Sequence, residues 1–229
     1  DVLDSGIDYM DKRRMQLILS KLKYPLYHLD FESFPGPLPR FKGEKPYTQS
    51  VFQFNLHIEH APGVCDKDKD SYYYLATDLS DHRYELTKKL CSLIGTEGNV
   101  IAWNDAFEKG RMRELAEFFP EFKDQLYSII ERTYDLWYIF KGSHHALYDV
   151  WNVSEKKGIN YYNEALQGSF SIKKVLPIFV PELSYSNLDV GNGTQALVTY
   201  AKFPYMSKKD FEFKKQALIE YCKQDTYAM

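Results

Sequence analysis

The chain has 229 residues, enough for one large domain with a sizeable core, and its formal net charge is −3 at pH 7. This charge excludes a bulk basic surface for duplex binding, although 19 Tyr and 15 Phe leave aromatic rings that can stack on unpaired bases. The widely spaced Cys65, Cys91 and Cys222 exclude a disulfide framework and a CxxC zinc site. We therefore expect a cytoplasmic protein, and no apolar run is long enough to bring it into a membrane.

Residues 1–22 are predicted to form an N-terminal helix, because apolar side chains recur at helical spacing over residues 5–21 behind Ser5, a candidate cap. The chain begins at Asp1 and stops within a predicted helix. We therefore expect a longer parent chain, with further domains as partners and residues 1–22 linking to an upstream region. Residues 23–229 are predicted to form the main domain.

The first predicted strand, around residues 24–34, carries two acids on one face. Side chains alternate along a strand, so Asp30 and Glu32 point to the same side as His28 and Phe34. Like charges one pleat apart repel each other, and a divalent cation between them would relieve this repulsion. An exposed strand end with both acids in water explains the same spacing, and this stretch alone does not choose between the two.

The rest of the chain predicts a mixed α/β domain. Residues 51–59 alternate strictly, with Phe52, Phe54 and Leu56 on the apolar face and His57 on the polar one, where we expect a surface histidine. A third strand at 72–76 completes an antiparallel meander. The later predicted elements are a helix at 80–94, a strand at 99–103, helices at 105–119 and up to 132, a fifth strand within 134–140, an irregular region at 141–168, a helix from Ser171 ended by Pro177, a helix capped by Thr194, and a last helix capped by Ser207.

Two further segments carry acids in comparable settings. Asn104, Phe107 and Glu108 follow a buried strand where it leads into a helix, and such carboxyl ends commonly hold ligands. For this segment taken alone, Asn104 or Asp105 as a helix cap is the better explanation, and Glu108 could likewise be an ordinary exposed helical residue. In the last helix, Tyr221 and Asp225 are four residues apart and share one face.

Taken together, these three segments resemble the motifs of the DEDD exonuclease superfamily. Asp30 and Glu32 match its first motif, and Asn104, Phe107 and Glu108 match its second. Tyr221 with Asp225 matches the third motif of the Tyr variant, because the position five residues before Asp225 is Glu220 rather than the His of the other variant. One departure is Glu108, where the family has Asp. The resemblance implies a ribonuclease-H-like fold, a five-stranded mixed sheet beginning with three antiparallel strands and flanked by helices.

The resemblance also implies the role of each residue. Two divalent cations, Mg²⁺ or Mn²⁺, about 4 Å apart would activate a water and stabilise the leaving oxygen of a phosphodiester. Their implied ligands are Asp30, Glu32, Glu108 and Asp225. Tyr221 would orient the attacking water, since a phenol with an ordinary pKa near 10 is a poor base at neutral pH.

Other polar features have ordinary explanations. The aromatic rings of Phe34, Trp103 and Phe107 flank the proposed acids, and one of them is a candidate to stack a terminal base, although core packing explains Trp103 and Phe107 as well. Lys173 and Lys174 are predicted to be a surface pair that a substrate phosphate could also reach. His144 and His145 are predicted to lie in a solvated loop.

A narrower resemblance is to a bacterial family labelled a domain of unknown function, and it rests on the segments Phe52–Phe54, Gly168–Pro177 and Tyr221–Thr226. The wider resemblance implies a metal-dependent 3′ to 5′ exonuclease with single-stranded DNA or RNA as its partner. The alternative is a nuclease-like module without catalysis that binds nucleic acid or a partner domain, and the Glu108 departure keeps it open. No motif here reports contact with a ribose 2′-hydroxyl, so the sequence does not choose between DNA and RNA.

Overall fold

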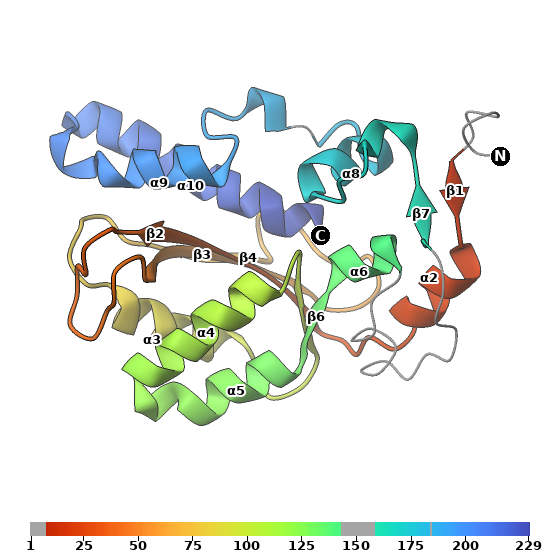
Figure 1. Cartoon of the computed structure of the whole chain (residues 1–229), viewed down its shortest axis with the longest axis horizontal. Coiled ribbons are helices and arrows are strands. Elements are labelled where there is room, and N and C mark those ends of the chain that lie inside the picture. The colour runs from red at the N-terminus through yellow and green to blue at the C-terminus, as the bar shows by residue number, and fades with distance from the viewer. Residues whose placement is uncertain (1–7, 143–158, 184) are drawn as a thin grey trace.

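The computed structural model describes residues 8–142, 159–183 and 185–229 and shows a five-stranded mixed sheet between two layers of helices (Figure 1). The strand order is β4-β3-β2-β5-β6, in which β2, β3 and β4 are antiparallel neighbours and β5 and β6 run parallel to β2. The strands are β2 (Leu26–Pro35), β3 (Gln49–Glu59), β4 (Ser71–Leu75), β5 (Asn99–Ala102) and β6 (Thr133–Asp135). The predicted meander and the mixed α/β class are therefore confirmed.

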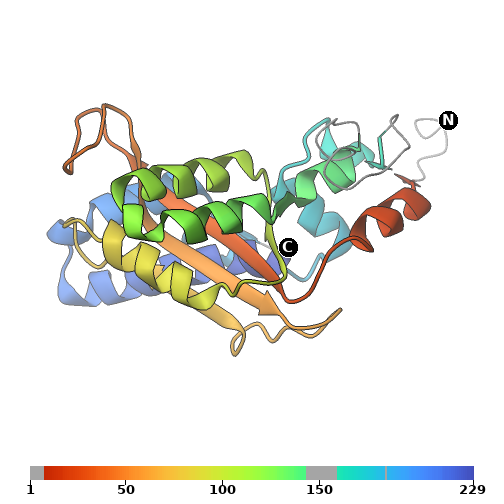
Figure 2. The same ribbon diagram turned by 90° about the horizontal axis from the view of Figure 1, so that it is seen from below.

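Helices cover both faces of this sheet. Figures 1 and 2 show α3, α4 and α5 on one face, with α9 and α10 on the other. The longer helices are α2 (Lys12–Leu19), α3 (Arg83–Leu93), α4 (Ala106–Phe118), α5 (Lys123–Glu131), α6 (Leu136–Lys141), α8 (Ile172–Phe179), α9 (Gly193–Ala201) and α10 (Lys208–Ala228). The short 3₁₀ turns are η1 (Pro120–Phe122), η2 (Glu164–Leu166), η3 (Tyr185–Asn187) and η4 (Phe203–Tyr205). The main apolar core lies between the sheet and α3, α4 and α5, and a second one lies under α9 and α10.

A smaller group of elements lies at one end of the sheet. Here β1 (Tyr9–Met10) pairs with β7 (Tyr161–Tyr162), and α2 packs against α6 through Ile18 and Ile139 (Figure 1). The predicted helix over 5–21 is shorter than expected. Its cap is Asp11, whose carboxylate accepts a hydrogen bond from the Arg14 backbone N at 2.9 Å, whereas Ser5 lies outside the described residues.

Three other predicted elements differ from the structure. The segment 134–140 is mostly α6 rather than a strand, because Asp135 accepts a hydrogen bond from Trp137 N at 2.9 Å and caps a helix there. Pro177 lies inside α8, which continues to Phe179. Asn192, rather than Thr194, caps α9 through the Gln195 backbone N. The Ser207 cap of α10 is confirmed, and His144 and His145 lie outside the described residues.

A β-bulge in β3 changes the strict alternation that the sequence predicts. Glu32 pairs with Gln53 but Ser33 pairs with Val51, so Phe52 is an extra residue between them. Phe52 therefore faces α9, where its ring stacks on Tyr200 at 4.1 Å between centroids, while Phe54 faces the opposite core. Bulges re-aim side chains beside them, and this one lies opposite Glu32.

The prediction that His57 lies at the surface is wrong, because α10 covers the polar face of β3. His57 is fully buried, and its Nε2 donates to the Lys67 carbonyl at 3.0 Å while its Nδ1 accepts from the Thr226 hydroxyl at 2.8 Å. Asn55 Nδ2 donates to the same Thr226 oxygen at 2.6 Å. Burial lowers the pKa of His57 to about 4, so the ring is neutral at physiological pH.

We predict that Thr226→Val destabilises the protein far more than Thr226→Ser. Valine removes the hydroxyl that serves both Asn55 and His57, and a buried polar group without its partner costs about 1–3 kcal/mol. We expect the free energy of unfolding, from urea titration, to fall by about 2–3 kcal/mol in Thr226→Val. Equal stability of the valine and serine variants would contradict this role of the hydroxyl.

Candidate functional site

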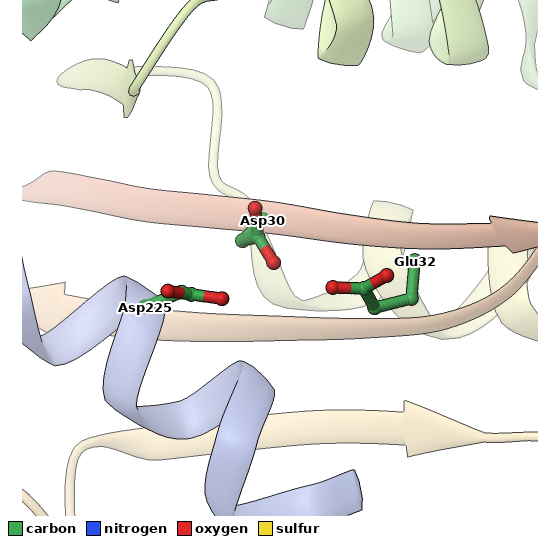
Figure 3. Close-up of side chains that lie close together, drawn as sticks. All are labelled: Asp30, Glu32 and Asp225. Atoms are coloured by element: carbon green, nitrogen blue, oxygen red, sulfur yellow. The ribbon is translucent and has the colours of Figure 1, made fainter. Parts of the chain in front are cut away.

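Three acids meet where α10 crosses β2. One carboxylate oxygen from each of Asp30, Glu32 and Asp225 lies within 4.8 Å of the other two, and Figure 3 shows the carboxylates pointing into the space between strand and helix. Glu32 and Asp225 are buried, whereas Asp30 is partly buried. We call this group the three-acid cluster. The structure thus brings together acids almost two hundred residues apart, as the sequence motifs predict.

The proximity of these carboxylates favours their protonated forms. Burial raises the pKa of Asp30 well above its usual value, and the charges of Asp225, Glu32 and Glu108 add to this effect. Burial and Asp225 raise the pKa of Glu32 to about 8, although Lys173 and Tyr221 oppose the shift. Desolvation also raises the pKa of Asp225. In the absence of a cation, the cluster therefore holds protons at neutral pH.

Tyrosines and a lysine border the cluster. Tyr185, in η3, donates from its hydroxyl to Asp225 Oδ1 at 2.6 Å. Lys173, in α8, donates from Nζ to the Tyr221 hydroxyl at 3.0 Å, and its Nζ lies 4.8 Å from the centroid of the Tyr221 ring. Burial, followed by the charge of Asp225, raises the pKa of Tyr221, which stays a neutral phenol. Within the described part of the chain, the Lys173 ammonium makes no ion pair.

The predicted ligand Glu108 lies beside the cluster rather than in it. Glu108 is in the first turn of α4 and is only 3% exposed, so the alternative of an ordinary exposed helical residue is wrong. Its Oε2 is buried without a hydrogen-bond partner. Desolvation raises its pKa to about 8, and its charge contributes to the raised pKa of Asp30. Among the described residues, the group of acids close enough to share one ion contains Asp30, Glu32 and Asp225 but not Glu108.

The corner between β5 and α4 depends on Asp135, an acid that the sequence analysis did not select. Its carboxylate accepts hydrogen bonds from the backbone N of Asn104 at 2.8 Å and of Asp105 at 3.1 Å. These bonds hold Asn104 in the left-handed region, with a φ of 70°. Asn104 is exposed, and Asp105 precedes the helix and pairs with Lys109 at 2.5 Å. Burial raises the pKa of Asp135 to about 6.

Two of the three candidate stacking residues, Phe34 and Phe107, pack against the protein. Phe34 lies edge-on to Tyr200 at 6.5 Å between centroids, and the Arg40 guanidinium covers its ring at 4.6 Å. Phe107 packs on the main core and has the Arg111 guanidinium 5.0 Å from its centroid. Both rings are partly buried.

The sequence analysis did not identify three side chains of the site as functional residues. Tyr185 lies outside every motif, Asp135 falls in an apolar run that resembled a strand, and Cys222 resembles an ordinary core residue. The Cys222 thiol lies 3.4 Å from Asp30 Oδ2 and donates to it. For Asp135 a signal was present, because an acid directly before a helical stretch is a common N-cap. Lys173 was weighed as a surface residue, and the structure places it against Tyr221 instead.

The chemistry of these side chains fits a hard divalent cation. Mg²⁺ and Mn²⁺ prefer carboxylate oxygens, and the cluster offers three such groups whose mutual repulsion a cation would relieve. The buried Glu108 Oε2, which lacks a partner, is a fourth oxygen nearby. The donor set contains no histidine, and the one thiol in contact, Cys222, has a strongly raised pKa that keeps it protonated.

Comparison with known protein families assigns the chain to one family of domains. The chain belongs to the family described as "Domain of unknown function (DUF2779)", which it matches over residues 27–171. This range contains Asp30, Glu32, Glu108 and Asp135, and α10 with Tyr221 and Asp225 lies beyond it. No solved structure matches the chain.

Two relatives come from mycoplasma-like bacteria. The chain is 31% identical over 229 residues to "Uncharacterized protein UU173" of Ureaplasma parvum serovar 3, covering 93% of this chain and 31% of that protein. It is 26% identical over 235 residues to "Uncharacterized protein MG366 homolog" of Mycoplasma pneumoniae, covering 94% and 32%, respectively. The chain thus spans about a third of the length of these curated relatives. Among the described helices, none has the length and apolar character needed to cross a membrane.

We predict that the protein loses stability between pH 6.5 and 8.5 when no divalent cation is present. Glu32 and Glu108 have folded-state pKa values of about 8, above their unfolded value of 4.5, so in this window the folded state holds protons that the unfolded state has released. A loss on the order of 2 kcal/mol would lower Tm by roughly 4–8 °C. The window starts at pH 6.5 because His57 has the opposite effect below that pH. Its folded-state pKa is lowered, so its contribution makes the stability rise with pH there.

Thermal unfolding in a chelator-containing buffer tests this expectation. The matched variant is Glu32→Gln, which cannot ionise and should show a smaller fall in Tm over the same pH range. A Tm that is constant or rises in the unsubstituted protein would contradict the raised carboxyl pKa values.

Proposed function

We propose that this domain is a metal-dependent 3′ to 5′ exonuclease of the DEDD superfamily, Tyr variant, acting on single-stranded nucleic acid. The observation that carries the proposal is the convergence of Asp30, Glu32 and Asp225 from β2 and α10 within 4.8 Å. Tyr221 lies one helical turn before Asp225, with its hydroxyl held by Lys173. These are the residues, in the order and setting, that the motif resemblance selects.

The sheet order supports a ribonuclease-H-like fold. In the five-stranded sheet, the three antiparallel strands come first in the chain, and β5 and β6 then join the β2 edge in parallel, each after a helical segment. That is the order of elements that the resemblance implies. Asp30 and Glu32 lie on the central strand β2, beside the carboxyl end of β5, where open sheets of this kind bind ligands, and Asp225 faces them from α10.

The divalent cations implied by the proposal would be held by Asp30, Glu32 and Asp225, with Glu108 as the nearest further carboxylate. When bound, they would supply the positive charge that activates a water and stabilises the leaving oxygen. Loading them requires the protons of the cluster to leave, so we expect affinity for the cation to rise with pH.

The remaining side chains have roles that follow from their contacts. The neutral Tyr221 phenol can orient a water by hydrogen bonding but cannot accept its proton at neutral pH, because its pKa is raised. The Lys173 ammonium lies over Tyr221, and in the described part of the chain no carboxylate pairs with it directly. This positive charge can therefore bind a phosphate oxygen. Tyr185 fixes the orientation of Asp225. The products would be nucleoside monophosphates.

We predict that Asp30→Asn abolishes both the stabilisation by Mn²⁺ and the cleavage of 5′-labelled single-stranded RNA and DNA. The amide removes a central negative charge but resembles the protonated acid in shape, so the cation-free variant should be at least as stable as the unsubstituted protein. A cation that binds only the folded state at 100 times its Kd raises stability by about 2.7 kcal/mol. We expect that gain to disappear in Asp30→Asn.

The same experiment separates the two candidate functions. A ladder that shortens from the 3′ end, absent with chelator and in Asp30→Asn, supports the exonuclease. Mn²⁺ stabilisation without cleavage supports the binding module, for which the Glu108 departure is the specific observation. The exonuclease proposal fails if Mn²⁺ stabilises neither protein or if Asp30→Asn cleaves at the normal rate.

We predict opposite effects of Lys173→Met on cation binding and on turnover. Methionine keeps an apolar chain of similar length but removes a positive charge that lowers the pKa of Glu32 and Asp225. Above about pH 8, where protons no longer compete for Glu32, Mn²⁺ affinity should therefore rise because a repelling charge is gone, whereas the rate of hydrolysis should fall about tenfold or more. Calorimetric titration and single-turnover cleavage measure the two effects.

The matched control is Lys174→Met. The Lys174 side chain is exposed and hydrogen-bonds Gln167 Oε1 at 3.3 Å, away from Tyr221. We expect its affinity and rate to equal those of the unsubstituted protein. A parallel fall in both quantities for Lys173→Met would indicate a structural rather than a phosphate-binding role.

A further inference from the structure

An open groove of about 740 Å³ lies beside the three-acid cluster. Its lining includes Trp103, Asn104, Trp137, Phe170 and Lys173, and we call it the aromatic groove. It is formed where the end of β5, the start of α6 and the loop before α8 meet. Its volume falls within the range of sites for small organic groups. None of the motifs that support the proposed function accounts for the groove as a whole.

The two indole rings are fixed by contacts of their own. Trp103 Nε1 donates to the Phe170 carbonyl at 2.9 Å, and its ring lies 5.4 Å from that of Phe140. Trp137 lies edge-on to Tyr138 at 4.9 Å, and the Lys141 ammonium lies 4.2 Å from its ring centroid. Both indoles remain only partly buried. A flat ligand would therefore meet aromatic surfaces that are already ordered, with little loss of side-chain entropy.

Lys173 connects the groove to the three-acid cluster. It lines the groove, and its Nζ donates to the hydroxyl of Tyr221. A ligand that places a phosphate against Lys173 and the cluster therefore has an aromatic-walled space next to that phosphate. The chemistry that matches both parts is a phosphodiester carrying a flat heterocycle.

We propose that the aromatic groove binds one unpaired nucleobase of a single-stranded nucleic acid whose adjoining phosphate lies at the three-acid cluster. The inference rests on the proposed function for the position of that phosphate. A duplex is excluded as the occupant because the faces of its bases are stacked on one another. Among the described residues, the groove lining contains no acid and no arginine, and stacking accepts any base, so binding is tolerant of sequence. The exposed Asn104 amide, which lines the groove, can hydrogen-bond a base edge.

Abasic oligonucleotides test this assignment. A series of 5′-fluorescein 12-mers, made in DNA and in RNA, carries a single abasic nucleotide at each position in turn from the 3′ end. Affinities are measured by fluorescence anisotropy with the Asp30→Asn protein, in which the substrate stays intact. We expect the oligonucleotide with its abasic nucleotide at one particular position near the 3′ end to bind about 5- to 150-fold more weakly than the intact 12-mer. This is the range found for stacking of a base on an aromatic side chain.

Trp137 is the residue to remove, because Trp103 also holds the Phe170 backbone. In the Asp30→Asn/Trp137→Ala protein the intact 12-mer should bind about as weakly as the abasic one, and the penalty at that position should disappear. Trp137→Phe should restore most of the penalty that an abasic nucleotide at that position causes. Tyr205→Ala is the matched control, since that aromatic ring is 86% exposed and lies outside the groove. Mn²⁺ stabilisation of the single Trp137→Ala variant shows that the fold and cluster remain intact.

These measurements test the groove assignment separately from the exonuclease proposal. If the oligonucleotides bind with no position-dependent penalty, or if Trp137→Ala weakens every abasic oligonucleotide equally, the groove assignment is wrong while the exonuclease proposal stands. The groove assignment is also wrong if no oligonucleotide binds. The exonuclease proposal is then judged separately by Mn²⁺ stabilisation and cleavage with the unsubstituted protein.

Discussion

The site depends on the packing of one helix, α10, across the central strands of the sheet. Thr226 bonds to Asn55 and His57 on β3, and the neighbouring residue Asp225 faces Asp30 and Glu32 on β2. Gln53 donates to the carbonyl of Leu218 two turns earlier in the helix. These buried hydrogen bonds fix the position of the helix. They hold three carboxyl groups together that would separate if they were free to move.

The repulsion between the three carboxyl groups explains which side chains surround them. Positive charge and hydroxyl donors lie around the acids, with Lys173, Tyr185 and Tyr221 all contributed by segments after residue 170. The sheet supplies two acids, and the C-terminal third of the chain supplies the third acid and the groups that moderate its charge. A site assembled from both ends of the chain can form only when the whole domain is folded.

The sequence predicts the frame of this site well, for physical reasons. Asp30 and Glu32 could be placed on one face because a strand has a period of two, and Tyr221 and Asp225 because a helix brings residues four apart together. Three of the four acids that the motifs select converge, and the fourth, Glu108, lies beside them. The mixed sheet and its antiparallel start also follow from alternation and from short loops.

The features that the sequence did not predict depend on which surface covers which. The polar face of β3 alternates like a solvated face, and only the position of α10 reveals that His57 is fully buried. Phe52 changes sides because of a bulge that no local pattern marks. Asp135 and Tyr185 act through contacts with residues far away in sequence. Such tertiary effects are not contained in periodicity.

The cysteines have a practical consequence for chemical labelling. Cys91 and Cys222 are buried, Cys65 is partly buried, and burial raises the pKa of each thiol, to about 11 for Cys65 and Cys91. Thiolates are the reactive form, so the native side chains should react slowly with maleimides at neutral pH. A single cysteine introduced on an exposed loop can then carry a spectroscopic probe without removal of the native thiols, and Cys222 can keep its contact with Asp30.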